Sequence, residues 1–239
     1  ALLLSAFFSA SVAGYYALTF RLMSLPMNFI GQSIGQVFFQ RASVAKNDGK
    51  LEDVVEKTFS HLFKVAILPI SILTLIAQDV FVLAFGEEWR ESGVYLQILG
   101  IWSFFWFISS PVSSLFPILE RQKDLLYIQI GIFVSRLASL TIGGYIGDEQ
   151  TALALFSISG FILYGYLNIS ILTLSGVNFY NLFIKLLPSI SLSLFLVGIL
   201  ALTYLATFAP LLIVIISLLL SIFYYYFIFK INKEQVRNY

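Results

Sequence analysis

Long apolar runs, separated by short clusters of charged, glycine or proline residues, make up most of this sequence. Within these runs, apolar residues do not alternate with polar ones at every second position, which excludes the strands of a membrane barrel. Each main run approaches or exceeds the roughly 20 residues that an α-helix needs to cross the hydrocarbon core of a bilayer. Seven complete transmembrane helices are therefore predicted, over residues 13–39, 59–85, 94–119, 125–146, 151–174, 187–208 and 211–229. The pattern predicts an all-α fold, a multi-pass transmembrane helical bundle.

Three shorter segments have patterns of their own. Residues 1–11 are apolar but too short to span a bilayer, so they are predicted to be the tail of a truncated transmembrane helix. Residues 41–60 contain an Asn-Asp-Gly turn followed by apolar residues at helical spacing, with charged residues between them, which predicts an amphipathic helix on the cytoplasmic membrane surface. Residues 177–185 are rich in aromatic side chains, and this predicts an interfacial linker before the last two helices.

The composition narrows the function. The chain is 59% hydrophobic and 11% charged, whereas soluble domains carry about 25% charged residues, so a soluble enzyme is excluded. A formal net charge of +1 without a basic patch excludes a nucleic-acid binder. There is no cysteine, and no group of His, Asp and Glu has metal-ligand spacing, so neither a metal nor a cofactor is predicted. His61, the single histidine, lies at the end of a predicted span, where an interfacial role is the ordinary reading.

The positions of Lys and Arg predict the topology, because short cytoplasmic loops are enriched in basic residues. Of the residues outside the predicted spans or at their ends, one side of the membrane holds eleven basic residues and the other holds only Arg90. The eleven are Arg41, Lys46, Lys50, Lys57, Lys64, Arg121, Lys123, Lys185, Lys230, Lys233 and Arg237. This asymmetry predicts a cytoplasmic C-terminus and places residues 87–91 and 148–149 outside.

Polar residues within the first predicted span lie on one side of it. At about 100° per residue, one stripe is formed by Arg21, Ser24, Asn28, Gln32, Gly35 and Gln36. Amides and an arginine are unfavourable in hydrocarbon, so this stripe predicts a face that lines a water-filled cavity. The alternative is hydrogen bonding between helices, for which one or two such residues usually suffice.

Two further charges lie within predicted spans. Arg136 is near the middle of the span 125–146, on a stripe with Gln129 and Ser139, and the sequence offers no carboxylate at its depth. A carboxylate of another lobe, water or an anionic substrate is therefore expected to compensate its charge, with water favoured in the resting state and the substrate in the loaded one. Asp79 lies at the same predicted depth as Arg21, so it is either the partner of Arg21 in an ion pair or a residue that couples ion movement to transport.

Several motifs in their order resemble the oligosaccharide flippases of bacterial surface-polysaccharide synthesis, in the multidrug/oligosaccharidyl-lipid/polysaccharide exporter superfamily. The resemblance covers nearly the whole chain. It rests on Gly14-Tyr15-Tyr16-Ala17 before Arg21 and Pro26, on Leu83-Ala84-Phe85-Gly86 with Trp89, and on Ser109-Ser110-Pro111-Val112-Ser113 before Arg121-Gln122.

The resemblance implies one lobe of a two-lobe alternating-access transporter of roughly twelve to fourteen helices. Residues 12–176 would form the second lobe, and residues 177–239 would add a linker, two peripheral helices and a cytoplasmic tail. The N-terminal lobe of the same chain, which is missing here, and the membrane lipids would be its partners.

The implied substrate is an undecaprenyl-diphosphate-linked oligosaccharide, moved from the cytoplasmic to the outer leaflet of the bacterial inner membrane without covalent chemistry. Substrate contacts are expected from Arg21, Asn28, Gln32, Gln36, Gln129 and Arg136. Arginine suits a diphosphate because it stays charged and presents a fork of donors.

Two other functions stay open on the sequence. A cavity rich in carboxylates would favour a drug or small-solute exporter of the same superfamily, but Asp79 is the only carboxylate within the predicted spans. A membrane polysaccharide polymerase or ligase would place catalytic residues on a long outer loop, and the predicted outer loops are short.

Overall fold

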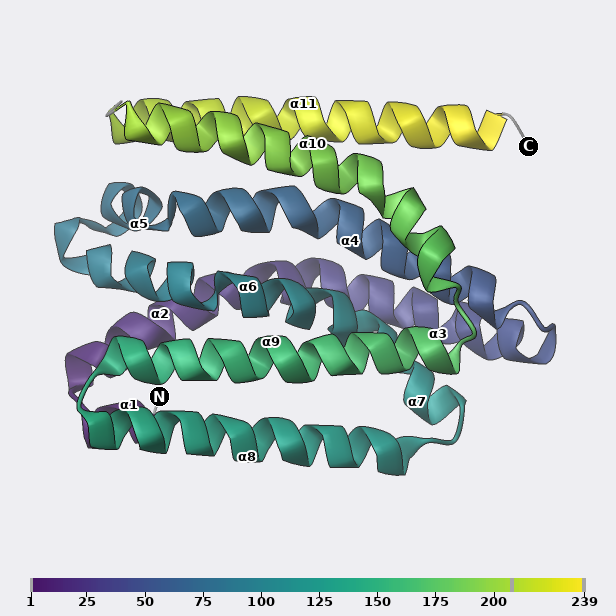
Figure 1. The fold of residues 1–239 in the computed structure, drawn as a ribbon, viewed down its shortest axis with the longest axis horizontal. Coiled ribbons are helices and arrows are strands. Elements are labelled where there is room, and N and C mark those ends of the chain that lie inside the picture. Colours follow the sequence, from purple (N-terminus) through teal and green to yellow (C-terminus); the bar gives the residue numbers. More distant parts are fainter. Residues whose placement is uncertain (1, 207–208, 238–239) are drawn as a thin grey trace.

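The computed structural model describes residues 2–206 and 209–237, and the side chains of residues 229 and 231–237 lie outside this description. Two of the basic residues used to predict the topology, Lys233 and Arg237, are among them. Every described element is helical (Figure 1). The elements are α1 (Leu2–Phe7), α2 (Ala10–Pro26), η1 (Met27–Gly31), α3 (Gln32–Asn47), α4 (Leu51–Leu75), α5 (Ala77–Phe85), η2 (Glu87–Trp89), α6 (Arg90–Val112), α7 (Leu115–Ile118), α8 (Gln122–Ile146), α9 (Glu149–Leu174), α10 (Phe179–Leu205) and α11 (Pro210–Arg237).

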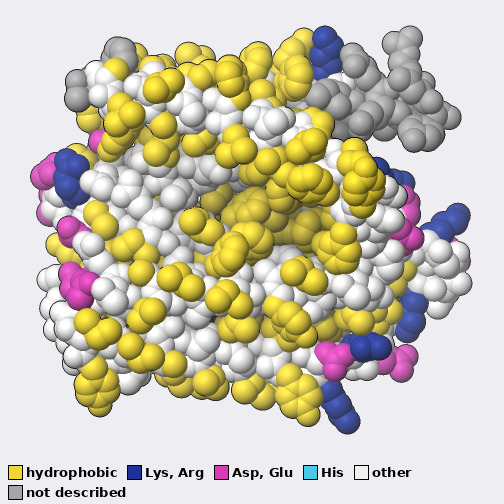
Figure 2. Space-filling view, in the orientation of Figure 1, with side chains coloured by type: hydrophobic (Ala, Val, Ile, Leu, Met, Phe, Trp, Pro, Cys, Tyr) yellow, Lys and Arg dark blue, Asp and Glu magenta, His cyan; other side chains and the backbone are white. Residues whose placement is uncertain are grey.

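The predicted membrane bundle is confirmed. Six segments of the described chain are long and apolar enough to cross a bilayer: Leu51–Leu75, Glu87–Ile118, Gln122–Ile146, Glu149–Leu174, Phe179–Leu205 and Pro210–Ile228. Figure 2 shows hydrophobic side chains spread over the long face of the molecule and charged side chains gathered at its two ends. The chain is therefore a multi-pass membrane protein.

The first predicted span, residues 13–39, is not one unbroken α-helix. Proline lacks a backbone N–H, so Pro26 leaves one hydrogen bond of the helical ladder unmade at the end of α2. A π-helical segment, Met27–Gly31, follows and leads into α3. The polar stripe predicted from a regular helix therefore crosses a junction between two helices.

The surface helix predicted within residues 41–60 is wrong as a separate element. The α3 helix continues to Asn47, and α4 runs without a break from Leu51 to Leu75. The apolar residues that suggested membrane contact, Val55, Phe59 and Leu62, are buried in the protein core. Their spacing reflects packing against neighbouring helices rather than against lipid.

The predicted linker at residues 177–185 is shorter than expected, because α10 already begins at Phe179. The side chain of Asn178 caps this helix by accepting a hydrogen bond from the Asn181 N–H at 3.1 Å. Most of the aromatic residues in this segment belong to the first turns of a helix.

The helix α6 lies at the centre of the bundle and packs on α9, α4, α5 and α2. Its large side chains Tyr95 and Trp102 are fully buried. At one edge, α8 packs on α9, and at the opposite edge the pair α10–α11 packs on α4 (Figure 1).

The last helix is attached to α4 by polar contacts as well as by apolar packing. The hydroxyls of Tyr224 and Tyr225 donate to the backbone carbonyls of Lys64 and Val65, each at 2.8 Å. In an α-helix the carbonyl of residue 65 would accept from the N–H of residue 69, and that residue is Pro69, which has none. Tyr225 thus satisfies a carbonyl that the proline leaves free.

Candidate functional site

The predicted polar stripe is open on the outside of the helices that carry it. Arg21 of α2, Asn28 of η1 and both Gln32 and Gln36 of α3 are exposed. Gln32 and Gln36, with Gly35 and Phe39, line an open hollow of about 480 Å³. All four predicted site residues are therefore accessible, and two of them, Gln32 and Gln36, share one hollow; we call these four residues the polar face.

The opposite side of the same helices is fixed to the bundle. Phe38 and Ala42 of α3 are buried in the core. The α3 helix also packs on α6 at Gly35, where a Cβ would lie in ordinary van der Waals contact, 3.6 Å from the Cα of Pro111. The polar face is thus held in a defined position and is not a loosely packed surface.

Arg136 lies in a different setting, between α6, α8 and α9. Its guanidinium carbon is 5.5 Å from the ring centre of Trp102, 5.1 Å from that of Phe156 and 5.8 Å from that of Tyr164. The Nη2 group also donates to the Tyr164 hydroxyl at 3.2 Å. We call these four residues the aromatic box.

The aromatic box corrects one prediction from the sequence. The sequence predicts compensation by a carboxylate of another lobe, by water or by substrate, and the structure adds three aromatic rings of this chain around the guanidinium. Aromatic faces carry negative charge density that attracts a cation, with a strength of about 2 kcal/mol or more when desolvated. The Nε of Arg136 is nevertheless buried without a hydrogen-bond partner in the described structure.

Tight packing holds the box together. The indole of Trp102 lies against Gly160 of α9, where any Cβ would overlap the ring. Neither Trp102 nor Phe156 could be singled out in the sequence, because aromatic residues are frequent throughout the chain. The signal that could have found them is the glycine at the depth of a large aromatic residue on a neighbouring helix.

Gln129 and the polar face are not brought together. Gln129 is exposed on α8, about two turns from Arg136. The helix α8 packs mainly on α9, whereas α3 packs on α4 and α6. The six predicted substrate residues thus fall into two groups, one on the polar face and one on α8.

Asp79 does not form the predicted ion pair with Arg21. Asp79 is buried, in the first turn of α5, and Arg21 is exposed. Asp79 instead interacts electrostatically with Arg90 and with Tyr204 of α10. Within the described residues, no three His, Asp or Glu side chains converge to hold a metal ion.

Comparisons with known proteins agree with this architecture. Residues 1–94 match the model of a family described as "Polysaccharide biosynthesis protein". The structure is similar to that of the lipid II flippase MurJ in an inward closed conformation, with a TM-score of 0.69 and 16% sequence identity. The similarity covers 92% of this chain and 47% of the flippase, so this chain spans about half the length of that protein. None of the curated proteins compared matches the sequence.

The fold is therefore similar to about half of that lipid flippase. The family match over residues 1–94 supports the resemblance to proteins of polysaccharide synthesis that the sequence predicts.

Proposed function

We propose that this chain is one lobe of a two-lobe transporter that moves a lipid-linked saccharide across the bacterial inner membrane, without covalent chemistry. The observation that carries the proposal is the polar face, where an arginine and three amides of the first predicted span are exposed on helices whose other side is buried. Such groups are unfavourable against lipid tails, so their side of the lobe is expected to face water and a second lobe.

The chemistry of the polar face suits a lipid-linked oligosaccharide. Arg21 offers a planar fork of donors that matches a diphosphate, and its charge persists at any physiological pH. Asn28, Gln32 and Gln36 each carry both a donor and an acceptor, which matches the hydroxyl groups of sugars. Undecaprenyl diphosphate with an attached oligosaccharide, moved from the cytoplasmic to the outer leaflet, is the substrate that we propose.

Gln129 and Arg136 are proposed as additional substrate contacts. Gln129 is accessible, and Arg136 is only half-buried, so a diphosphate could reach the guanidinium at the open side of the aromatic box. Asp79 is our candidate for coupling an ion gradient to transport, because it is a buried carboxylate at the start of a helix within the bundle.

The proposed topology places the turn between α3 and α4 and the C-terminus in the cytoplasm. Cysteines introduced at Lys50 and Glu88 should then react with an impermeant maleimide from opposite sides of the membrane. Labelling of both from the same side would contradict this orientation.

The transport role is tested by display of surface polysaccharide, measured beside the abundance of the full-length protein in the membrane. Arg21→Ala, and the double variant Gln32→Ala with Gln36→Ala, should each reduce display by at least ten-fold at unchanged abundance. Arg121→Ala is a matched control, since Arg121 is an exposed arginine that lies outside the polar face. Normal display in the Arg21→Ala and double variants would contradict the assignment of the polar face.

A further inference from the structure

A second polar site lies between α3 and α4, away from the polar face. The two helices enclose an open cleft of about 410 Å³ near the turn that joins them. The cleft is lined by Ser33, Ile34, Val37, Phe38 and Arg41 of α3 and by Lys57, Thr58 and His61 of α4. It combines an apolar wall with a cationic end.

The cleft faces a different direction from the polar face. Arg41 is nine residues beyond Gln32 on the same helix, and nine steps of about 100° bring it half a turn around the axis. A molecule in this cleft would therefore come from the lipid that surrounds the lobe, and not from the space that the polar face lines.

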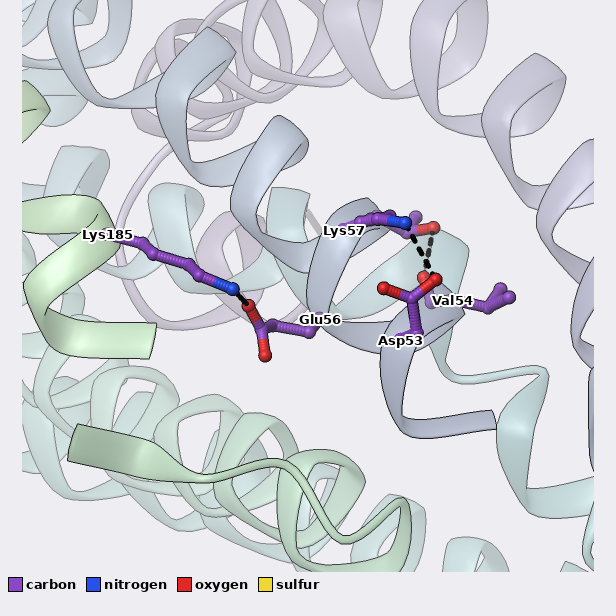
Figure 3. Close-up of polar contacts among 6 residues, drawn as sticks. Asp53, Val54, Glu56, Lys57 and Lys185 are labelled. Carbon is purple, nitrogen blue, oxygen red and sulfur yellow. Dashed lines mark hydrogen bonds and ion pairs between the residues drawn. The ribbon is translucent and has the colours of Figure 1, made fainter. Parts of the chain in front are cut away.

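Arg41 is the cation in the cleft that remains available for an anion. It is exposed and forms no ion pair with any described residue. Lys57 also lines the cleft, but its ammonium is bound by the Asp53 carboxylate at 2.7 Å (Figure 3). The hydroxyls of Ser33 and Thr58 donate to carbonyls of their own helices, so they do not compete for this role.

The apolar part of the cleft extends beside this cation. Val37 lines the cleft and is 50% exposed, and Val44, at a similar angle on the same helix, is 59% exposed. The exposed imidazole of His61 stands on the α4 side, one turn beyond Lys57. An amphiphile with an anionic head and an acyl chain would match both parts.

We propose that this cleft binds an anionic phospholipid of the surrounding membrane, with the phosphate at Arg41 and His61 and an acyl chain along Val37. Basic pockets between transmembrane helices at the membrane boundary are suited to acidic headgroups. Lys46 and Lys185 are paired with Glu120 and Glu56, so the headgroup contact is assigned to Arg41 and His61 alone. This binding is independent of transport through the polar face.

Native mass spectrometry of the full-length protein in detergent tests the proposal, with phosphatidylglycerol in one arm and phosphatidylcholine in the other. Phosphatidylglycerol should bind at least five-fold more tightly. One basic residue near a membrane surface contributes about a five-fold change, so Arg41→Gln should weaken phosphatidylglycerol binding by about five-fold and remove most of the difference between the lipids. Arg121→Gln, at an exposed arginine outside the cleft, should bind both lipids like the wild type.

The apolar wall has its own test. Val37→Asn should weaken binding of both lipids, and inorganic phosphate at millimolar concentration should not displace phosphatidylglycerol. Equal binding of the two lipids by the wild-type protein, or an equal loss in Arg41→Gln and Arg121→Gln, would overturn the proposal. Displacement by inorganic phosphate alone would show a simple anion site and would also overturn it. Because Arg41 and Val37 are exposed, their variants are expected to keep the wild-type unfolding midpoint, which is measured alongside.

Discussion

Arg21 and Arg136 both lie in segments predicted to cross the membrane, but their surroundings differ. Arg21 is exposed on a surface shared with three amides. Arg136 is enclosed by the rings of Trp102, Phe156 and Tyr164. One arginine thus lies on an open surface, whereas the other has three aromatic rings and a tyrosine hydroxyl as partners.

This difference separates function from stability. Substitution of a polar group that is packed inside the lobe removes its native contacts, whereas a group on the polar face has few contacts to remove. We therefore expect substitutions in closed polar contacts to lower the free energy of unfolding, and substitutions on the polar face to change transport while leaving that free energy nearly unchanged.

Arg136→Ala should give the largest loss of stability. It removes cation–π attraction of about 1–2 kcal/mol for a half-buried arginine and a hydrogen bond to Tyr164 of about 1 kcal/mol, so the free energy of unfolding should fall by about 2–3 kcal/mol. Arg136→Lys keeps the charge but not the planar group, and it should lose less. Chemical unfolding of the full-length protein in detergent measures both.

Arg21→Ala is the matched control for this comparison, because it removes an arginine from the polar face. Its free energy of unfolding should change by no more than about 0.5 kcal/mol. Equal losses in Arg21→Ala and Arg136→Ala would break the distinction between an open and a closed arginine.

Gly160→Ala should be the next largest effect, because the new methyl group would overlap the indole of Trp102. Forcing an extra carbon into a packed core costs about 1–3 kcal/mol. Gly165, one turn further along α9, has no neighbouring atom within 4 Å of the place that a methyl group would occupy. Gly165→Ala should therefore not destabilise the protein. An equal loss of unfolding free energy at both glycines would contradict the role of Gly160 in packing against Trp102.

Tyr225→Phe should cost about 1–2 kcal/mol, because the Val65 carbonyl loses its donor while Pro69 still provides none. In a Pro69→Ala background the N–H of residue 69 can bond to that carbonyl, so the same substitution should cost less. The double-mutant cycle measures this coupling. Tyr226→Phe, at an exposed tyrosine on the same helix, should have little effect, and coupling near zero would contradict the assignment.

Much of the fold could be predicted from the sequence, because lipid demands long apolar helices and leaves a strong pattern. The positions of α8 and α9 agree closely with their predicted spans, and the predicted span 94–119 is covered by α6 and α7. The π-helical segment after Pro26 and the start of α4 were harder to predict. Apolar spacing alone does not tell whether a residue contacts lipid or another helix. In α4, Val55 and Phe59 are buried, so they contact other helices.

The candidate site divides in the same way. The polar face could be predicted because its residues share a helical stripe, which is a local property. The aromatic box and the surroundings of Asp79 could not, since they depend on residues far apart in sequence, such as Trp102 with Arg136 and Tyr204 with Asp79. Matching depth suggested a pair between Arg21 and Asp79, but depth alone does not fix the direction in which a side chain points.

Asp148→Asn should have the smallest effect, because this residue is exposed in the turn before α9, outside the membrane-spanning segments. Its carboxylate caps the helix by accepting from the N–H groups of Gln150 at 3.2 Å and Thr151 at 3.1 Å, and also from the Thr151 hydroxyl. These bonds, the hydroxyl bond foremost, lower the pKa of Asp148 below its usual value. Its contribution to stability is therefore complete above the unfolded pKa, about 3.9, and is lost as the pH falls through the lower folded value.

Asparagine can keep the cap but cannot titrate. The difference in unfolding midpoint between wild type and Asp148→Asn should thus be small at pH 7, constant down to about pH 5, and should change only below about pH 4. The difference between wild type and Arg136→Ala has no such dependence on Asp148 and should persist at pH 4. A difference for Asp148→Asn that already changes between pH 7 and pH 5 would mean that another group carries the titration, and this exposed cap would then not be the acid-sensitive contact of the turn.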